Sequence, residues 1–131
     1  IPSEVVLADG STTVNELILA FANVGDQQVE LIQPVNDGSG LYSQALSSEK
    51  ADANACEIVL HHLGSRFHSL EQWQAFRSEL DLEKHTLAFE NMGGDAHYLY
   101  TDERKFMGHF LEYMWLDEAG AAMFDAIPQN S

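Results

Sequence analysis

The sequence predicts an α+β fold in which strands dominate. Most apolar residues fall in runs of strand length that end at Gly, Pro, Asn or Asp, the residues that interrupt strands. Only one segment, residues 69–80, has strong helical spacing. From Cys56 onward the predicted order is strand, helix, strand, strand, strand. The part before it predicts further strands, which resemble the ending of a second unit of the same kind.

The first part, residues 1–50, predicts a short strand followed by a hairpin. The Gly25-Asp26 turn lies between two long apolar runs, which is a hairpin signal. Residues 35–40 have the composition of a loop, and Ser39 would cap a short helix after it. The segments expected here are strands over 4–8, 13–24 and 27–34 and a helix over 41–46.

A linker and a second part, residues 56–131, complete the chain. Residues 47–54 are polar and without a period, and we place the linker itself at 51–55. The clearest helix begins after Ser69, which forms a capping box with Gln72. Its apolar residues recur at helical spacing: Leu70, Trp73, Phe76 and Leu80. The remaining segments expected are strands over 56–67, 85–91, 96–101 and 108–116, a charged loop over 102–107, and a helix over 117–125 before a frayed tail.

The charge of the chain excludes several classes of partner. Its 21 acidic residues outnumber its 6 lysines and arginines, which gives a formal net charge of −15. No basic stripe could neutralise phosphates, so we expect neither nucleic acid nor an anionic membrane as a partner. No apolar run reaches the roughly 20 residues of a membrane span. The first residues, Ile1-Pro2-Ser3-Glu4, lack the basic flank of a signal peptide.

The single cysteine, Cys56, excludes an internal disulfide and is typical of a reducing, cytoplasmic environment. It stands at the start of an expected apolar strand. This position predicts a buried structural thiol rather than a nucleophile.

Three polar side chains interrupt expected strands: Glu30, His62 and Glu112. Burying such a group is costly unless it is paired, hydrogen-bonded or bound to a metal. Because side chains alternate along a strand, His61 and His62 point to opposite faces, and only one can face inward. The structural alternatives are a hydrogen-bonded core histidine for His62 and an edge carboxylate facing water for Glu30. Two carboxylates and an imidazole on different strands are typical of a divalent metal site.

A family resemblance accompanies these residues. The motifs that carry it are Val29-Glu30-Leu31-Ile32-Gln33-Pro34, Asn36-Asp37-Gly38-Ser39 with Tyr42, His61-His62-Leu63-Gly64 and Gly108-His109-Phe110-Leu111-Glu112. In this order and spacing the chain resembles the vicinal oxygen chelate superfamily, the glyoxalase and bleomycin-resistance fold. Within it, the chain is similar to the glyoxalase-like branch that includes methylmalonyl-CoA epimerases. The resemblance extends from about Glu16 onward.

The resemblance implies paired β-α-β-β-β modules whose curved mixed sheet surrounds a metal cleft. Ligands come from the first and last strands of each module, which implies Glu30, His62 and Glu112 here. The first strand and helix of the first module would precede Glu4, so they are expected from upstream residues or from a partner chain, or the site would be incomplete. A homodimer, with or without exchanged modules, is also implied.

The implied cofactor is a divalent metal ion: Zn, Ni, Co, Mn, Mg or Fe. It would hold a small oxygenated acid, thioester or dicarbonyl through two oxygens, with Glu30 or Glu112 as the catalytic base. This chemistry belongs to an isomerase, epimerase or lyase. The alternatives are an Fe(II) ring-cleaving dioxygenase and a metal-free drug-binding protein of the bleomycin-resistance type, which the acidic composition would suit.

Four further residues are candidates for the same site. Arg66 shares the face of His62 and would meet an anionic substrate group, with a salt bridge to an acidic neighbour as the alternative. Tyr98 would bind substrate or pack in the core. His61 and His109 would support the ligands without touching the metal, with simple packing as the alternative for His61 and a surface position for His109.

Overall fold

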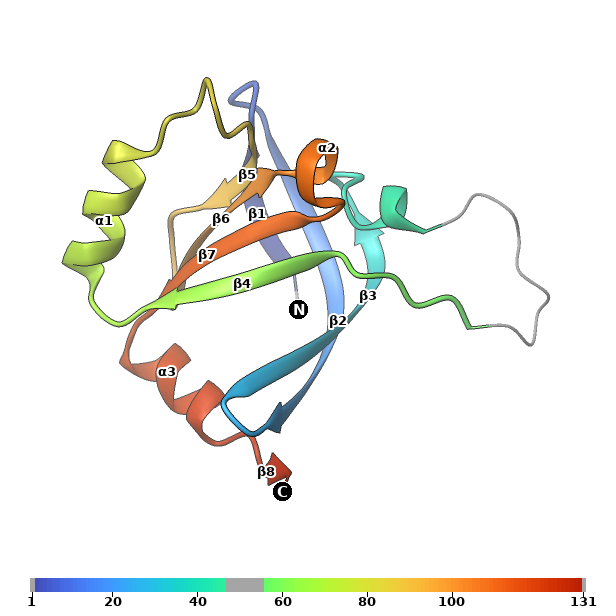
Figure 1. The fold of residues 1–131 in the computed structure, drawn as a ribbon, viewed down its shortest axis with the longest axis vertical. Coiled ribbons are helices and arrows are strands. Elements are labelled where there is room, and N and C mark those ends of the chain that lie inside the picture. The colour runs from blue at the N-terminus through green and yellow to red at the C-terminus, as the bar shows by residue number, and fades with distance from the viewer. Residues whose placement is uncertain (1, 47–55, 131) are drawn as a thin grey trace.

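The computed structural model describes residues 2–46 and 56–130 as a strongly curled mixed sheet with three helices on its outside and at its ends (Figure 1). The strands are β1 (Pro2–Leu7), β2 (Thr12–Val24), β3 (Gln27–Asp37), β4 (His62–Phe67), β5 (Leu87–Asn91), β6 (Ala96–Asp102), β7 (Phe110–Leu116) and β8 (Gln129–Asn130). The helices are α1 (Leu70–Glu79), α2 (Arg104–Met107) and α3 (Glu118–Asp125), and Ser43–Ala45 form a short 3-10 turn. The predicted α+β class and curved sheet are confirmed.

The strand order across the sheet is β3-β2-β1-β5-β6-β7-β4, and β8 joins beside β2. Neighbours along the main path are antiparallel except for β4 and β7, which run parallel. The predicted hairpin is present as β2 and β3, and Gly25 takes a positive φ of 59° in its turn, a conformation that suits glycine. The first and last strands in the order, β3 and β4, are the two edges of the sheet.

Curling brings these two edges toward each other (Figure 1). Glu30 on β3 and His62 on β4 lie 3.3 Å apart, although the two strands are at opposite ends of the strand order. We call the line where these edges face each other the β3–β4 seam. Side chains on the inner side of the sheet therefore converge there from both halves of the chain.

The core fills the inner side of the sheet next to this seam. Its buried members come from several strands and from the loop after β3: Val5, Tyr42, Phe89, Tyr100 and Phe110. These side chains are mostly aromatic, and burial of such large apolar surfaces is the main driving force for the fold. The polar side chains of the seam thus border a buried, mostly aromatic core.

Helix α1 covers the outer side of the sheet. It begins at the predicted cap, where Ser69 Oγ accepts a hydrogen bond from the Gln72 amide at 3.1 Å. Trp73 is fully buried, and the Phe76 ring lies 4.5 Å from the Tyr113 ring of β7. The helix therefore anchors the β4–β7 half of the sheet, as its apolar spacing predicted. No helix in the described part of the chain is long and apolar enough to cross a membrane.

The expected strand over 56–67 is wrong in its first half, because β4 begins only at His62. Its neighbour β7 begins at Phe110, directly opposite His62, so earlier residues have no strand beside them. Ile58 is 76% exposed, and Cys56 is exposed as well. The prediction of a buried thiol is therefore also wrong.

Four other expected segments differ from the observed elements. The expected loop over 102–107 contains α2, which Gly108 ends in the left-handed conformation (φ 82°). The expected loop at 35–40 begins later, because β3 continues to Asp37 across a bulge. The frayed tail contains β8, which pairs with the end of β2. The expected helix over 41–46 is only the 3-10 turn, and the predicted linker at 51–55 lies outside the described residues.

Candidate metal centre

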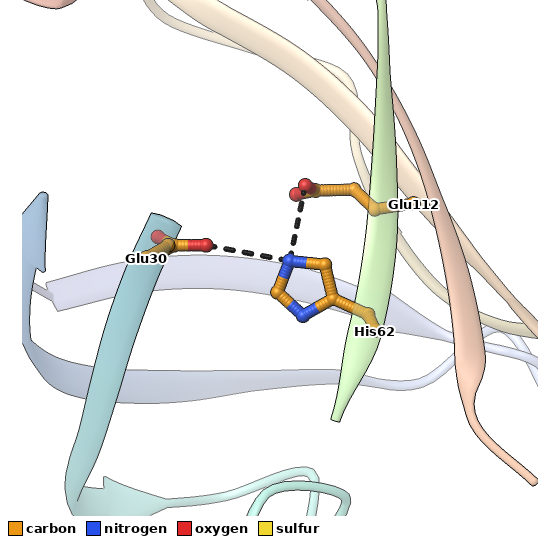
Figure 2. Close-up of side chains that lie close together, drawn as sticks. All are labelled: Glu30, His62 and Glu112. Carbon is orange, nitrogen blue, oxygen red and sulfur yellow. Dashed lines mark ion pairs between the residues drawn. The ribbon is translucent and has the colours of Figure 1, made fainter. Parts of the chain in front are cut away.

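Glu30, His62 and Glu112 converge at the β3–β4 seam (Figure 2). His62 Nε2 lies 3.3 Å from Glu30 Oε2 and 3.5 Å from Glu112 Oε2. One ligand atom from each residue lies within 4.8 Å of the others. For a tetrahedral ion with bonds of about 2.1 Å, ligand atoms lie about 3.4 Å apart. The two distances to His62 match that spacing.

Strand alternation directs each side chain to the inner side. On β3, Glu30 points inward, while Val29 and Leu31 are 49% and 54% exposed on the outer side. Glu112 stands in the middle of β7, directly opposite Gly64 of β4. A Cβ atom at Gly64 would lie 3.1 Å from Glu112 Oε2, so the glycine leaves room for the carboxylate. His62 is the first residue of β4 and faces both carboxylates.

The three side chains are largely shielded from water, with exposures of 8% for Glu112, 10% for His62 and 21% for Glu30. Burial by itself lowers the pKa of His62, but hydrogen bonds and the charges of Glu112 and Glu30 outweigh it and raise that pKa to about 9. At neutral pH the imidazolium therefore balances part of the carboxylate charge. A divalent cation would replace the His62 proton and balance both carboxylates. The donor set thus fits a divalent ion chemically.

The neighbouring tyrosines add no charge of their own. Burial, followed by the charge of Glu112, raises the pKa of Tyr100 well above its ordinary value. The Tyr100 ring lies edge-on to His62 at 5.1 Å between ring centroids. It therefore forms a neutral wall beside the site and strengthens electrostatic interactions by excluding water.

His61 lies behind His62, away from the carboxylates. Its Nδ1 is 3.1 Å from His62 Nδ1, and its Nε2 is 3.3 Å from the Leu41 carbonyl oxygen. Its ring stacks on Tyr42, with centroids 4.7 Å apart. Burial, followed by the adjacent His62 charge, lowers the pKa of His61 to about 4. His61 is therefore a neutral hydrogen-bonding partner of His62.

The other candidates have partners of their own. Arg66 Nη1 lies 3.7 Å from Asp125 Oδ1, and its Nε is buried without a hydrogen-bond partner. The Tyr98 hydroxyl shares a 2.8 Å hydrogen bond with Ser3 Oγ. His109 is buried, not at the surface, and its Nδ1 donates to the Phe110 carbonyl at 2.8 Å.

Sequence reasoning missed the group behind His61. Leu41 contributes a backbone carbonyl, which no side-chain pattern reveals. Tyr42 carried a signal, since it belongs to the motifs of the family resemblance, but its stacking on His61 was not predicted. The short pair of His85 and Glu103, 2.7 Å apart and away from the seam, was missed as well.

No protein-family model, curated protein or solved structure matches this chain.

Proposed function

We propose that this chain is a metal-dependent, glyoxalase-like enzyme: an isomerase, epimerase or lyase for a small oxygenated acid, thioester or dicarbonyl. The observation that carries the proposal is the convergence of Glu30, His62 and Glu112 around one point at the β3–β4 seam. They belong to three different strands and are far apart in sequence. A nitrogen and two carboxylates so placed are a chemically sound ligand set for a divalent metal.

We propose further that the fold consists of two related modules. The run β4-α1-β5-β6-β7 has its first and last strands side by side and parallel. The strands β1, β2 and β3 form an antiparallel series that would correspond to the last three strands of such a module. The contact between β1 and β5 would then join the two modules edge to edge. In that arrangement, Glu30 and Glu112 occupy corresponding last strands.

The three side chains would divide the work according to their burial. Glu112 and His62 are the more deeply buried, and they would hold the ion. A bound divalent ion would supply Lewis acidity toward two neighbouring substrate oxygens. Glu30 is the more exposed carboxylate and lies on an edge strand, so Glu30 Oε2 is suited to accept a proton from the adjacent substrate carbon. Return of that proton to the same or another carbon distinguishes epimerisation from isomerisation.

The ligand types favour this chemistry over the Fe(II) dioxygenase alternative. A ring-cleaving site of that kind uses two histidines and one carboxylate. The cluster in the described part of the chain has one histidine and two carboxylates. The second carboxylate provides a base that enolisation needs and oxygen activation does not. The metal-free binding alternative does not require the convergence of these three side chains.

The first test is metal content. Protein purified without chelator should contain about one equivalent of metal, measured by elemental analysis, and Glu112→Ala should lose it. The matched control is Glu103→Ala, which removes another buried carboxylate that pairs with a histidine outside the seam. Metal-free protein with an intact fold, unable to take up zinc, cobalt or manganese, would instead support the drug-binding alternative.

The second test is proton exchange at carbon. Loaded protein in D2O should exchange the proton next to the chelating oxygens of one member of a panel of 2-hydroxy acids, 2-oxo acids and thioesters, as read by NMR. Glu30→Gln should keep the metal more firmly than Glu112→Gln but reduce the exchange rate at least a hundredfold. Exchange that survives Glu30→Gln would assign the base to another residue.

A further inference from the structure

A line of hydrogen-bonding groups leads away from the proposed metal centre through the two adjacent histidines. It runs from the carboxylates through His62 Nε2 and Nδ1 to His61 Nδ1, and from His61 Nε2 to the carbonyl of Leu41. The two contacts of His61 measure 3.1 and 3.3 Å. Each imidazole therefore has a partner at both nitrogens.

The Leu41 end of this line fixes the proton positions along it. A carbonyl oxygen can only accept, so His61 Nε2 carries the proton of that hydrogen bond. In a neutral His61 ring, Nδ1 is then an acceptor. His62 Nδ1 must carry the proton between the two rings, since one of the two facing nitrogens has to donate. A neutral His62 ring with its proton on Nδ1 has a free lone pair on Nε2, the atom between Glu30 and Glu112.

Packing holds the His61 ring in the orientation that this pattern requires. The ring stacks on Tyr42 at 4.7 Å with an interplanar angle of 19°, and the Phe110 ring lies 4.9 Å away on β7. Tyr42 is buried, with 6% exposure, and belongs to the core. Rotation of His61 would break both the stacking and the contact with Leu41. The arrangement links the loop after β3 to His62 on β4.

We infer that His61 is a positioning residue, which together with the Leu41 carbonyl holds His62 in the tautomer that presents an unprotonated Nε2 to a metal ion. The inference rests on the proposed metal centre and deepens it. A hydrogen bond to the far nitrogen of a ligating imidazole fixes the ring and increases its basicity, and its loss weakens metal binding about tenfold to hundredfold in characterised sites.

Two substitutions separate hydrogen bonding from packing. His61→Phe keeps a flat ring against Tyr42 but cannot accept a hydrogen bond from His62. His61→Gln replaces the ring by a side-chain amide, which still has a hydrogen-bond acceptor and a donor. We expect the zinc dissociation constant to rise about tenfold to hundredfold in His61→Phe and to recover substantially in His61→Gln. His68→Phe, at an exposed histidine, is the control and should bind zinc like the unsubstituted chain.

Long-range proton–nitrogen NMR of the histidine rings provides a readout that packing alone would not change. In the unsubstituted zinc-loaded chain, we expect a hydrogen-bonded proton on His62 Nδ1 and one on His61 Nε2. The opposite assignment would overturn the inference without any variant. Unchanged zinc affinity and an unchanged His62 signal in folded His61→Phe would overturn it too. Failure of the unsubstituted chain to bind zinc would overturn the metal centre itself, and the inference with it.

Discussion

In the part of the chain that the structure describes, two clusters of histidine and carboxylate, one shielded and one partly exposed, differ in how well their charges are matched. At the β3–β4 seam, one imidazole is shared by two carboxylates at 3.3 and 3.5 Å. Near the start of α2, His85 Nδ1 meets a single carboxylate, Glu103 Oε1, at 2.7 Å. His62 is only 10% exposed, whereas His85 is 36% exposed.

This difference shows why only one of the clusters suggests a metal. One acid and one base in a short hydrogen bond satisfy each other and need nothing further. One imidazole between two shielded carboxylates leaves surplus negative charge in a place where water is scarce. A divalent ion would supply the missing charge at the seam, and it would have no comparable role at the other pair. Contact between a histidine and a carboxylate is therefore weak evidence for a metal site by itself. An excess of carboxylates over imidazoles is the stronger indication.

The largest expected effect comes from removing the imidazole from each cluster. In metal-free protein, His62→Ala leaves Glu30 and Glu112 facing each other without a cation, and we expect a loss of about 3–5 kcal/mol in the free energy of unfolding. His85→Ala removes the partner of one carboxylate from a partly exposed pair, and we expect a loss of about 1 kcal/mol. Urea unfolding at pH 7 measures both. Equal losses would mean that the two clusters serve the same structural purpose.

The inward direction of Glu30 could be predicted from the sequence because strand alternation is a local rule. It put Glu30 and Ile32 on one face of β3, and the structure has this arrangement. The same rule was wrong for His61 and His62, because β4 begins only at His62. Both rings face the core beside Tyr100, and their Nδ1 atoms lie 3.1 Å apart. The bend that brings β3 to β4 depends on the whole sheet, and only the resemblance suggested it. The start of β4 could not be read from its own apolar run, since the neighbouring strand determines it. The hydrogen bond from His61 to the Leu41 carbonyl could not be predicted for a different reason: every residue has a backbone carbonyl, so none is marked by the sequence.

The second test uses pH to weaken the seam alone. The pKa of His62 is about 9 in the folded protein, above the ordinary value of 6.5, because the two carboxylates outweigh burial. A raised pKa stabilises the fold fully below pH 6.5, and this contribution disappears as pH rises through 9. In metal-free protein we expect a decline on the order of 3 kcal/mol between pH 7 and 10, measured by urea unfolding.

A matched variant separates this decline from other titrations of the chain. His62→Gln has no proton to lose at that position, so its unfolding free energy should change less between pH 7 and 10. His85→Gln, which alters the other cluster, should keep the decline of the unsubstituted protein. Parallel profiles for all three proteins would show that His62 does not carry its charge at neutral pH.

The smallest expected effect concerns the space that Gly64 leaves for the Glu112 carboxylate at the β3–β4 seam. A methyl group at Gly64 would lie 3.1 Å from Glu112 Oε2, so Gly64→Ala should displace the carboxylate by a few tenths of an ångström. The carboxylate is the flexible end of its side chain, and we therefore expect folding to persist and zinc affinity to fall only severalfold. Gly93→Ala is the control, because its nearest side-chain atom, Asn91 Oδ1, is 4.0 Å away and the position is exposed. Isothermal titration of both variants with zinc gives the comparison. An unchanged affinity in Gly64→Ala would mean that Glu112 binds the ion in a position other than the one it takes opposite Gly64.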